Sequence, residues 1–172
     1  HFDFKKLGFF SSIVFSLVCL LSEVSAERPN VLLITVDTFR PDHLGAYGYV
    51  RETSPVLDRL ASEGVIFHNT ISSSSWTTPG LVSVLTGLWA PTHRVDRRGV
   101  SLSSSIPTMA KLLREEGYVA PDILYLSSIP NFQNLGFTRS YSDRDIFLPN
   151  GDEVLFQALK AYQDSTFFLY YH

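Results

Sequence analysis

The sequence predicts an α/β domain built around a mostly parallel β-sheet. Residues 30–36 form a short apolar, β-branched run that is bounded by Pro29 and Asp37, and residues 167–171 form a second apolar run. Runs of this length without alternation are typical of strands that helices cover on both faces. Helical segments with clear end signals lie between the two runs, and strands that alternate with helices favour a parallel sheet.

The ends of the helical segments are marked by capping residues. Ser54 followed by Pro55 indicates a helix start, and Gly64 indicates its end. The β-branched and aromatic residues 65–67 then predict a short strand. Further helices are expected at about 78–85 before Gly87, at 107–117 with Met109, Leu112 and Leu113 as the apolar stripe, and at 153–162.

Composition places the chain among globular proteins. Of its 172 residues, 45% are hydrophobic and 18% are charged, which suits one domain with a hydrophobic core. The formal net charge is -3, so there is no electrostatic reason to expect nucleic acid or an anionic membrane surface as a partner.

The first 26 residues resemble a secretory signal peptide. Lys5 and Lys6 precede an apolar stretch at 7–21, and small residues end the segment at 24–26. A single membrane anchor is the alternative, but the apolar run is shorter than the roughly 20 residues of a membrane span. We therefore expect an exported protein, periplasmic or secreted, with a mature domain at 27–172 and no stable membrane span. Because Cys19 lies in the signal segment, the mature chain has no cysteine.

Two residues carry the chemistry that can be read from position alone. Asp37 directly follows the first predicted strand, where ligands bind in open α/β sheets, and its carboxylate suits a divalent cation. An ordinary capping or loop carboxylate explains it equally well. Thr77 begins a predicted helix, where unpaired amides and the helix dipole favour an anion and a cation would activate the hydroxyl. A simple N-cap is the alternative for Thr77.

Several motifs in order resemble the opening of the sulfatases, which belong to the alkaline-phosphatase superfamily. Residues 30–49 combine the apolar strand, Asp37 and a D-x-L-G-x-Y-G element, and residues 53–61, 64–67, 85–87 and 108–118 continue the match in register. The resemblance covers residues 28 to about 118, and more weakly the rest of the chain. It implies an alkaline-phosphatase-like three-layer sandwich with a mostly parallel sheet. We expect this chain to be the truncated N-terminal part of that catalytic domain.

The resemblance also assigns roles to individual residues. Asp37 matches a metal-ligand aspartate, and Thr38 stands where the family often has a second aspartate. Thr77 stands in the place of the nucleophile, with Pro79 in register, whereas Leu81 replaces the motif arginine. The implied metal ligands are therefore Asp37 and Thr77, with Thr38 as a further oxygen. The implied metal is calcium, or zinc, manganese or magnesium. Formylglycine is not expected, because the convertible Cys or Ser and the arginine are both missing.

Further residues complete the expected site. The Trp-Thr-x-Pro pattern around Thr77 resembles the unmodified-threonine branch of the superfamily, which includes phosphodiesterases, nucleotide pyrophosphatases and phosphoethanolamine transferases. Ser74 and Ser75 are alternative nucleophiles, but they are out of register with the proline. His93 is a candidate substrate-binding residue, with a surface histidine as the alternative. Arg40 is a candidate for contacting an anion, with a solvated arginine as the alternative.

The sequence therefore predicts a metal-dependent hydrolase of sulfate or phosphate esters of small molecules or glycans, with Thr77 as the nucleophile. One alternative is a non-catalytic sulfatase-like binding protein, which Thr38 and Leu81 favour. The others are a phosphodiesterase and a phosphoethanolamine-transferase-type enzyme, the latter in a membrane-anchored form. The chain begins with His1 and stops within an apolar run, so we expect a fragment that is inactive and poorly folded on its own. The ester type, the metal and the oligomeric state stay open.

Overall fold

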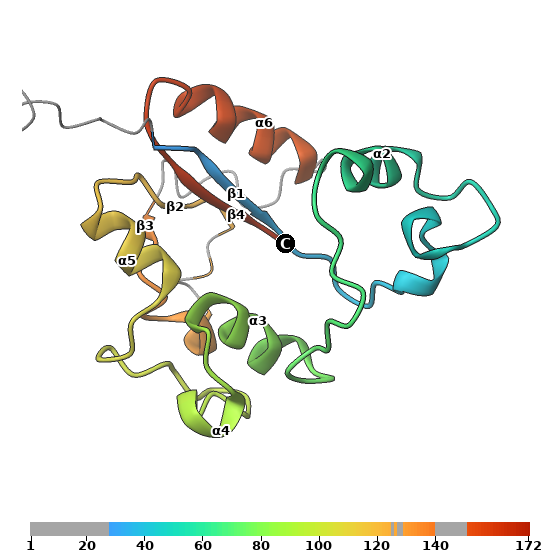
Figure 1. The fold of residues 1–172 in the computed structure, drawn as a ribbon. Helices are drawn as coiled ribbons and strands as arrows, with labels where there is room; N and C mark the ends of the chain where they lie inside the picture. Colours follow the sequence, from blue (N-terminus) through green and yellow to red (C-terminus); the bar gives the residue numbers. More distant parts are fainter. Residues whose placement is uncertain (1–27, 125, 127–128, 140–150) are drawn as a thin grey trace, which may run out of the picture.

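The computed structural model describes residues 28–124, 126, 129–139 and 151–172 (Figure 1). The expected signal segment, with Cys19, lies outside the described residues. Within the described ranges, no helix combines the length and the apolar character that crossing a membrane requires.

The strands run parallel, as the sequence predicts. β1 (Val31–Ile34) pairs with β4 (Phe168–Tyr171), with Val31 opposite Phe168. β2 (Pro121–Asp122) pairs in parallel with β3 (Thr138–Arg139). A parallel bridge between Val119 and Phe167 connects the two pairs. The strand order is therefore β1, β4, β2, β3, and the first and last strands of the chain lie side by side.

Helices lie on both faces of these strands and give three layers (Figure 1). One hydrophobic cluster lies on the side of α3 and α5 and contains Phe168 and Tyr170 of β4, whereas a second lies under α6 and contains Leu169. The helices are α2 (Pro55–Glu63), α3 (Thr77–Thr86), α4 (Ala90–His93), α5 (Met109–Glu115) and α6 (Gly151–Ala161), with short 3-10 turns at η1 (Pro41–His43), η2 (Gly45–Tyr47) and η4 (Pro130–Phe132).

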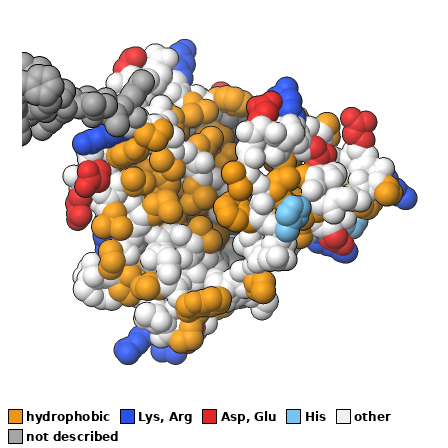
Figure 2. Space-filling model, in the orientation of Figure 1, with side chains coloured by type: hydrophobic (Ala, Val, Ile, Leu, Met, Phe, Trp, Pro, Cys, Tyr) orange, Lys and Arg blue, Asp and Glu red, His pale blue; other side chains and the backbone are white. Residues whose placement is uncertain are grey.

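The first strand is covered on one face only, which corrects the expectation of burial on both faces. Val31 and Leu33 pack against the larger core cluster, but Leu32 and Ile34 are 41% and 53% exposed. The cluster under α6 is built on β4, so the side chains of β1 that share its face stay open. Figure 2 shows hydrophobic side chains gathered in the middle of this view, over the sheet of Figure 1.

Two other expectations also differ from the structure. Residues 65–67 form no strand; Val65 and Phe67 are exposed, and no strand of the described chain pairs with them. In α5, Met109 and Leu112 are exposed, because the short helix faces the core through Ala110 and Leu113. The predicted starts and ends of the helices are otherwise confirmed to within a few residues.

Candidate active site

Asp37 and Thr77 meet at the carboxyl end of β1. Thr77 Oγ1 donates a hydrogen bond to the Asp37 carboxylate and lies 3.1 Å from each of its two oxygens. The two residues come from the loop after β1 and from the first turn of α3. Trp76 is the N-cap of α3 and Thr77 is its first helical residue. The simple N-cap reading of Thr77 is therefore wrong, and its hydroxyl is committed to Asp37.

The position of Thr77 on α3 favours negative charge beside it. The first amides of a helix have no acceptor within the helix, and the helix dipole adds positive potential at the same end. α3 has ten residues and ends at Gly87, which adopts a φ of 69° as the sequence predicts for a glycine C-cap. An anionic sulfate or phosphate group beside Thr77 would lie in this favourable field.

A cavity of about 750 Å³ opens beside the Asp37–Thr77 pair. His172 lines it from the end of β4, and its Nδ1 lies 2.8 Å from Thr35 Oγ1. Thr35 Oγ1 is also 2.9 Å from the hydroxyl of Tyr170, and burial raises the pKa of that phenol. Neither Thr35 nor Tyr170 was singled out from the sequence. The available signal was that both strands end at the same edge of a parallel sheet.

Thr38 occupies the turn that carries Asp37 into the cavity. Its φ is 51°, which is left-handed and uncommon for a β-branched residue. Backbone strain of this kind persists only where the surrounding structure imposes it, and it concentrates at functional sites. Thr38 lines the same cavity as Asp37 and Thr77, so the three predicted metal-ligand residues lie together.

The D-x-L-G-x-Y-G element is held in place by Asp58 of α2. The Asp58 carboxylate accepts hydrogen bonds from the Ala46 amide at 2.7 Å and from the Ser54 hydroxyl at 3.0 Å. A Cβ on Gly45 would lie 2.4 Å from the Asp58 carboxylate, so any larger residue here would displace the Asp58 side chain from its hydrogen bonds. The element therefore fixes the segment after β1 against α2, and Asp37 lies at the start of that segment.

Comparisons with known proteins identify the family of the chain. The family model for sulfatases matches residues 29–172. The chain belongs to the sulfatase family.

Curated relatives of this sulfatase-family chain include two sulfatases and a protein of the alkaline phosphatase superfamily. It is 31% identical over 101 residues to N-acetylgalactosamine-6-O-sulfatase of Bacteroides thetaiotaomicron, covering 55% of the chain and 19% of that protein. It is 36% identical over 111 residues to the multifunctional alkaline phosphatase superfamily protein PehA of Trinickia caryophylli. That match covers 60% of this chain and 21% of PehA. It is 32% identical over 128 residues to iduronate 2-sulfatase of Mus musculus, covering 69% and 23%. The chain thus spans about a fifth of the length of these curated relatives.

Solved structures confirm the predicted fold. The phosphonate monoester hydrolase of Agrobacterium radiobacter is 25% identical with a TM-score of 0.62, and the match covers 84% of this chain and 40% of that one. A sulfatase of the glycosaminoglycan locus of Bacteroides thetaiotaomicron matches with a TM-score of 0.59 at 17% identity. The match covers 85% of this chain and 51% of that sulfatase. The described chain is therefore part of an alkaline-phosphatase-like sandwich.

The sulfatase-family chain offers oxygen donors for a divalent cation at one point. The Asp37 carboxylate and the Thr77 hydroxyl are the type of donor that hard cations bind, and the Thr38 hydroxyl is a third in the same cavity. The described residues contain no group of three or more His, Cys, Asp or Glu side chains that could hold a metal ion. The donors fit such a cation in kind, and they are fewer than the six to eight oxygens that calcium takes.

His93 of the sulfatase-family chain contacts Ser83 of α3 and does not line the cavity. It is 2% exposed, so the surface reading is wrong. Its Nδ1 accepts a hydrogen bond from the Val95 amide at 3.0 Å, and its Nε2 is 3.1 Å from Ser83 Oγ on α3. The neutral ring must then carry its proton on Nε2, and burial lowers the pKa of the imidazole. This geometry does not support the predicted substrate contact.

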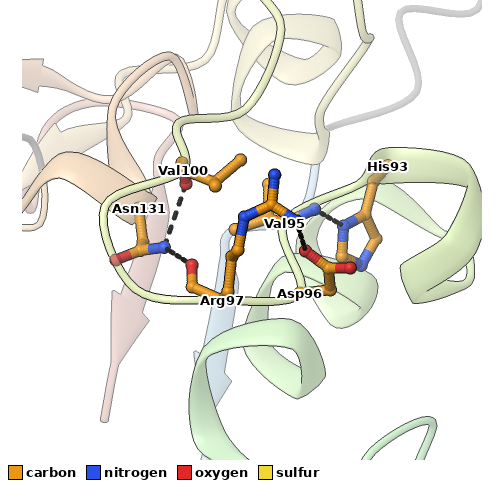
Figure 3. Close-up of polar contacts among 6 residues, drawn as sticks. All are labelled: His93, Val95, Asp96, Arg97, Val100 and Asn131. Carbon is orange, nitrogen blue, oxygen red and sulfur yellow. Dashed lines mark hydrogen bonds and ion pairs between the residues drawn. The ribbon is translucent and has the colours of Figure 1, made fainter.

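The loop that follows His93 is fixed by a second set of contacts (Figure 3). The Asn131 side-chain amide donates to the carbonyls of Arg97 at 2.7 Å and Val100 at 2.9 Å. Arg97 and Asp96 form an exposed ion pair of 3.7 Å. These hydrogen bonds hold the loop of residues 97–100 against η4. The Arg97 side chain has Asp96 as its partner, so its position is explained without a bound ligand.

The remaining candidates have local partners. Arg40 pairs with Asp42 at 2.5 Å in a fully exposed position, which raises the pKa of Arg40 and lowers the pKa of Asp42. Arg40 does not line the cavity of Thr77, so the solvated reading suits it. Ser74 Oγ accepts a hydrogen bond from the Trp76 amide at 3.1 Å. Leu81 of α3, in the place of the family arginine, is buried in the larger core cluster and also borders the cavity.

Proposed function

We propose that this chain carries the nucleophile of a metal-dependent hydrolase of sulfate or phosphate esters, and that Thr77 is that nucleophile. The observation that carries the proposal is the contact between Thr77 Oγ1 and both oxygens of Asp37 at 3.1 Å. These residues are forty positions apart, and both match functional positions of the sulfatase family. The helix start and the adjacent cavity supply the remaining requirements, an anion-binding field and room for an ester.

The proposed reaction proceeds in two displacements at the same hydroxyl. Thr77 Oγ1 gives its proton to the Asp37 carboxylate and forms a bond to sulfur or phosphorus, while the bond from that atom to the leaving oxygen breaks. The leaving oxygen takes a proton from solvent. Water then attacks the threonine ester and releases sulfate or phosphate. The freed Thr77 oxygen takes back the proton from Asp37, and the proton that the water loses goes to solvent. The amides at the start of α3 stabilise the charge on the transferred group.

Asp37 and Thr77, with Thr38, would hold the divalent cation in this proposal. A bound cation lowers the pKa of a coordinated hydroxyl and neutralises charge on the transferred group. The choice among calcium, zinc, manganese and magnesium rests on ligands that these three residues do not supply. Thr77 cannot form formylglycine by the usual conversion of Cys or Ser, so its own oxygen is the proposed attacking atom.

The ester type is open between sulfur and phosphorus. Two of the three curated relatives named above are called sulfatases and the third is called a multifunctional alkaline phosphatase superfamily protein, whereas the solved structure with the TM-score of 0.62 is called a phosphonate monoester hydrolase. An unmodified threonine and the absence of the family arginine at Leu81 support a phosphorus substrate. A phosphodiesterase or phosphonate monoesterase is the second candidate for that reason.

The experiment compares Thr77→Ala, Thr77→Ser and Thr78→Ala in the intact protein. Turnover of aryl sulfate, phosphate monoester, phosphodiester and phosphonate monoester is measured with and without a chelator. Removal of a nucleophile lowers kcat by about 1,000-fold or more, so Thr77→Ala should abolish turnover, while Thr77→Ser keeps a measurable part of it. Thr78, the next helix residue, does not line the cavity and serves as the control.

Two results would contradict the proposal. If Thr77→Ala turned over all four esters at the rate of the unchanged protein, Thr77 would not be the nucleophile. If the unchanged intact protein neither bound a divalent cation nor hydrolysed any of the four, the non-catalytic alternative would replace the enzyme.

We also propose that the protein is exported, with residues 1–26 as its signal. The support is the order of lysines, apolar stretch and small residues in the sequence. Mass spectrometry of the secreted or periplasmic fraction should find a mature N-terminus near Glu27. An uncleaved N-terminal segment in the membrane fraction would instead support the anchored alternative.

A further inference from the structure

The cavity beside Thr77 is a groove that extends along α3. Its lining residues on this helix recur at intervals of three and four, from Thr77 through Gly80 and Val84 to Gly87. These positions share one face of a helix, and a rise of 1.5 Å per residue places its far end about 15 Å from Thr77. The groove therefore continues well past the point where a sulfate or phosphate group would react.

The groove is lined by exposed apolar side chains at both of its ends. Trp89, just beyond the end of α3, is 64% exposed, and Trp76 and Phe39 at the Thr77 end are also exposed to solvent. Single exposed apolar residues are ordinary, but three aromatic rings around one cavity favour a ligand. Flat aromatic rings bind aryl and other apolar groups by stacking and by removing their surface from water.

Gly80 widens the groove because it has no side chain. A Cβ at this position would meet only the Ser74 carbonyl, at an ordinary contact distance of 3.9 Å. The fold itself therefore does not require glycine there, and Gly80 does not adopt a positive φ. The missing side chain instead leaves space for a ligand that lies along the helix.

The charge of the groove disfavours leaving groups that carry anionic substituents. Of the described residues that line it, none is Lys or Arg; Asp37 is the only acid and His172 the only imidazole. Among these described lining residues, anionic substituents on a ligand would find no permanent cation to pair with, and burying an unpaired charge is costly. A highly sulfated or uronate-rich glycan fits this lining poorly.

We propose that the groove along α3 takes an ester whose leaving group is uncharged, largely apolar and longer than a single ring. This inference rests on the proposed function, because Thr77 at one end of the groove supplies the reaction. The reacting group lies at the start of α3, and the leaving group extends toward Trp89.

The test uses the intact protein and esters of the type that it hydrolyses in a Thr77-dependent manner. Three probes are compared: the phenyl ester, the biphenyl-4-yl ester and the same biphenyl ester with a distal carboxylate. We expect kcat/KM for the biphenyl ester to exceed that for the phenyl ester by about tenfold, mostly through KM, because a second ring buries more apolar surface. The carboxylate should remove most of this gain.

Two groove variants and one control locate the effect. Trp89→Ala should lower kcat/KM for the biphenyl ester by about fivefold to tenfold and change that for the phenyl ester by less than about twofold. Gly80→Ala, one helical turn from Thr77, should lower kcat/KM for both esters, because its methyl group would occupy the space of the first ring. Phe156→Ala is the control, because Phe156 is an aromatic residue of similar exposure, 68%, on α6. It should leave both esters unchanged.

The outcomes separate this inference from the proposed function. Equal kcat/KM for the phenyl and biphenyl esters, or a preference for the carboxylated one, would overturn the groove assignment while Thr77-dependent turnover stood. A loss of thermal stability in Trp89→Ala with equal losses on both esters would show that this surface packs against protein instead. If no ester were turned over through Thr77, the proposed function would fail and this inference with it.

Discussion

At the scale of single residues, Thr38 is the position where a small change should alter the site most. It holds a φ of 51° beside Asp37, in the place where the family often has a second aspartate. Aspartate tolerates the left-handed region better than a β-branched residue and adds a carboxylate to the donor set. Thr38→Asp should therefore bind a divalent cation at least about tenfold more tightly, as isothermal titration calorimetry can measure.

The matched control for that change is Thr38→Asn, which relieves the backbone in the same way without adding charge. If Thr38→Asp bound the cation no more tightly than Thr38→Asn, the Thr38 position would not belong to the metal site.

His93 should make the stability of the fold depend on pH. Burial lowers the pKa of His93 in the folded protein, whereas an unfolded histidine has a pKa of about 6.5. Above pH 6.5 the ring is neutral in both states, so its contribution to stability is fully present. As the pH falls below about 6.5, the unfolded chain binds a proton that the folded chain rejects, and stability falls until the folded pKa is reached.

We expect the urea midpoint of the intact protein to decrease between pH 7 and pH 5, and His93→Gln to flatten that decrease. His68→Gln is the control, because His68 is exposed. Identical slopes for the two variants would show that another group controls the pH dependence.

The residues of the site differ in how far the sequence could predict them. Asp37 and Thr77 follow from local signals, the end of an apolar strand and the start of a capped helix. The Thr35–His172 contact joins residues 137 positions apart, and it depends on which strands are neighbours in the sheet. His93 is a candidate for substrate binding from its sequence position, with a surface histidine as the alternative, but its burial against Ser83 decides its role.

At the scale of elements, the junction between η2 and α2 is the contact that fixes the segment after Asp37. Asp58→Ala would remove the acceptor of the Ala46 amide and of the Ser54 hydroxyl. Leaving such groups without partners costs about 1–3 kcal/mol, so the free energy of unfolding should fall by about that amount in chemical denaturation. Turnover should fall as well, because Asp37 begins this segment.

Glu63→Ala, at the last residue of the same helix, is the control for Asp58→Ala. Equal unfolding midpoints for the two variants would mean that the carboxylate of Asp58 does not hold the element.

The sequence predicts a helix correctly where proline or glycine residues mark its two ends. Pro55 and Gly64 delimit α2, and Gly87 ends α3 in the left-handed conformation. Residues 65–67 failed as a strand because a strand needs a partner, and β propensity alone does not supply one. The stripe of α5 was misassigned for a related reason: which face of a helix is buried depends on its neighbours.

At the scale of the whole molecule, the open face of β1 is the feature that local reasoning could not give. Leu32 and Ile34 share a sheet face with Leu169, but only Leu169 lies in the cluster under α6. The chain spans about a fifth of the length of the curated relatives reported above. That the isolated chain is inactive and poorly folded stays a prediction; binding of a hydrophobic dye with no cooperative unfolding transition would support it.

The central claim is that Thr77 Oγ1 attacks the ester directly, and one measurement tests it most closely. The intact protein is mixed with its ester substrate, quenched in acid during turnover, digested and analysed by mass spectrometry. We expect a sulfate or phosphoryl group on Thr77 itself, and none in Thr77→Ala. A modified group on Ser74, Ser75 or any other residue, with Thr77 unmodified throughout turnover, would contradict the claim.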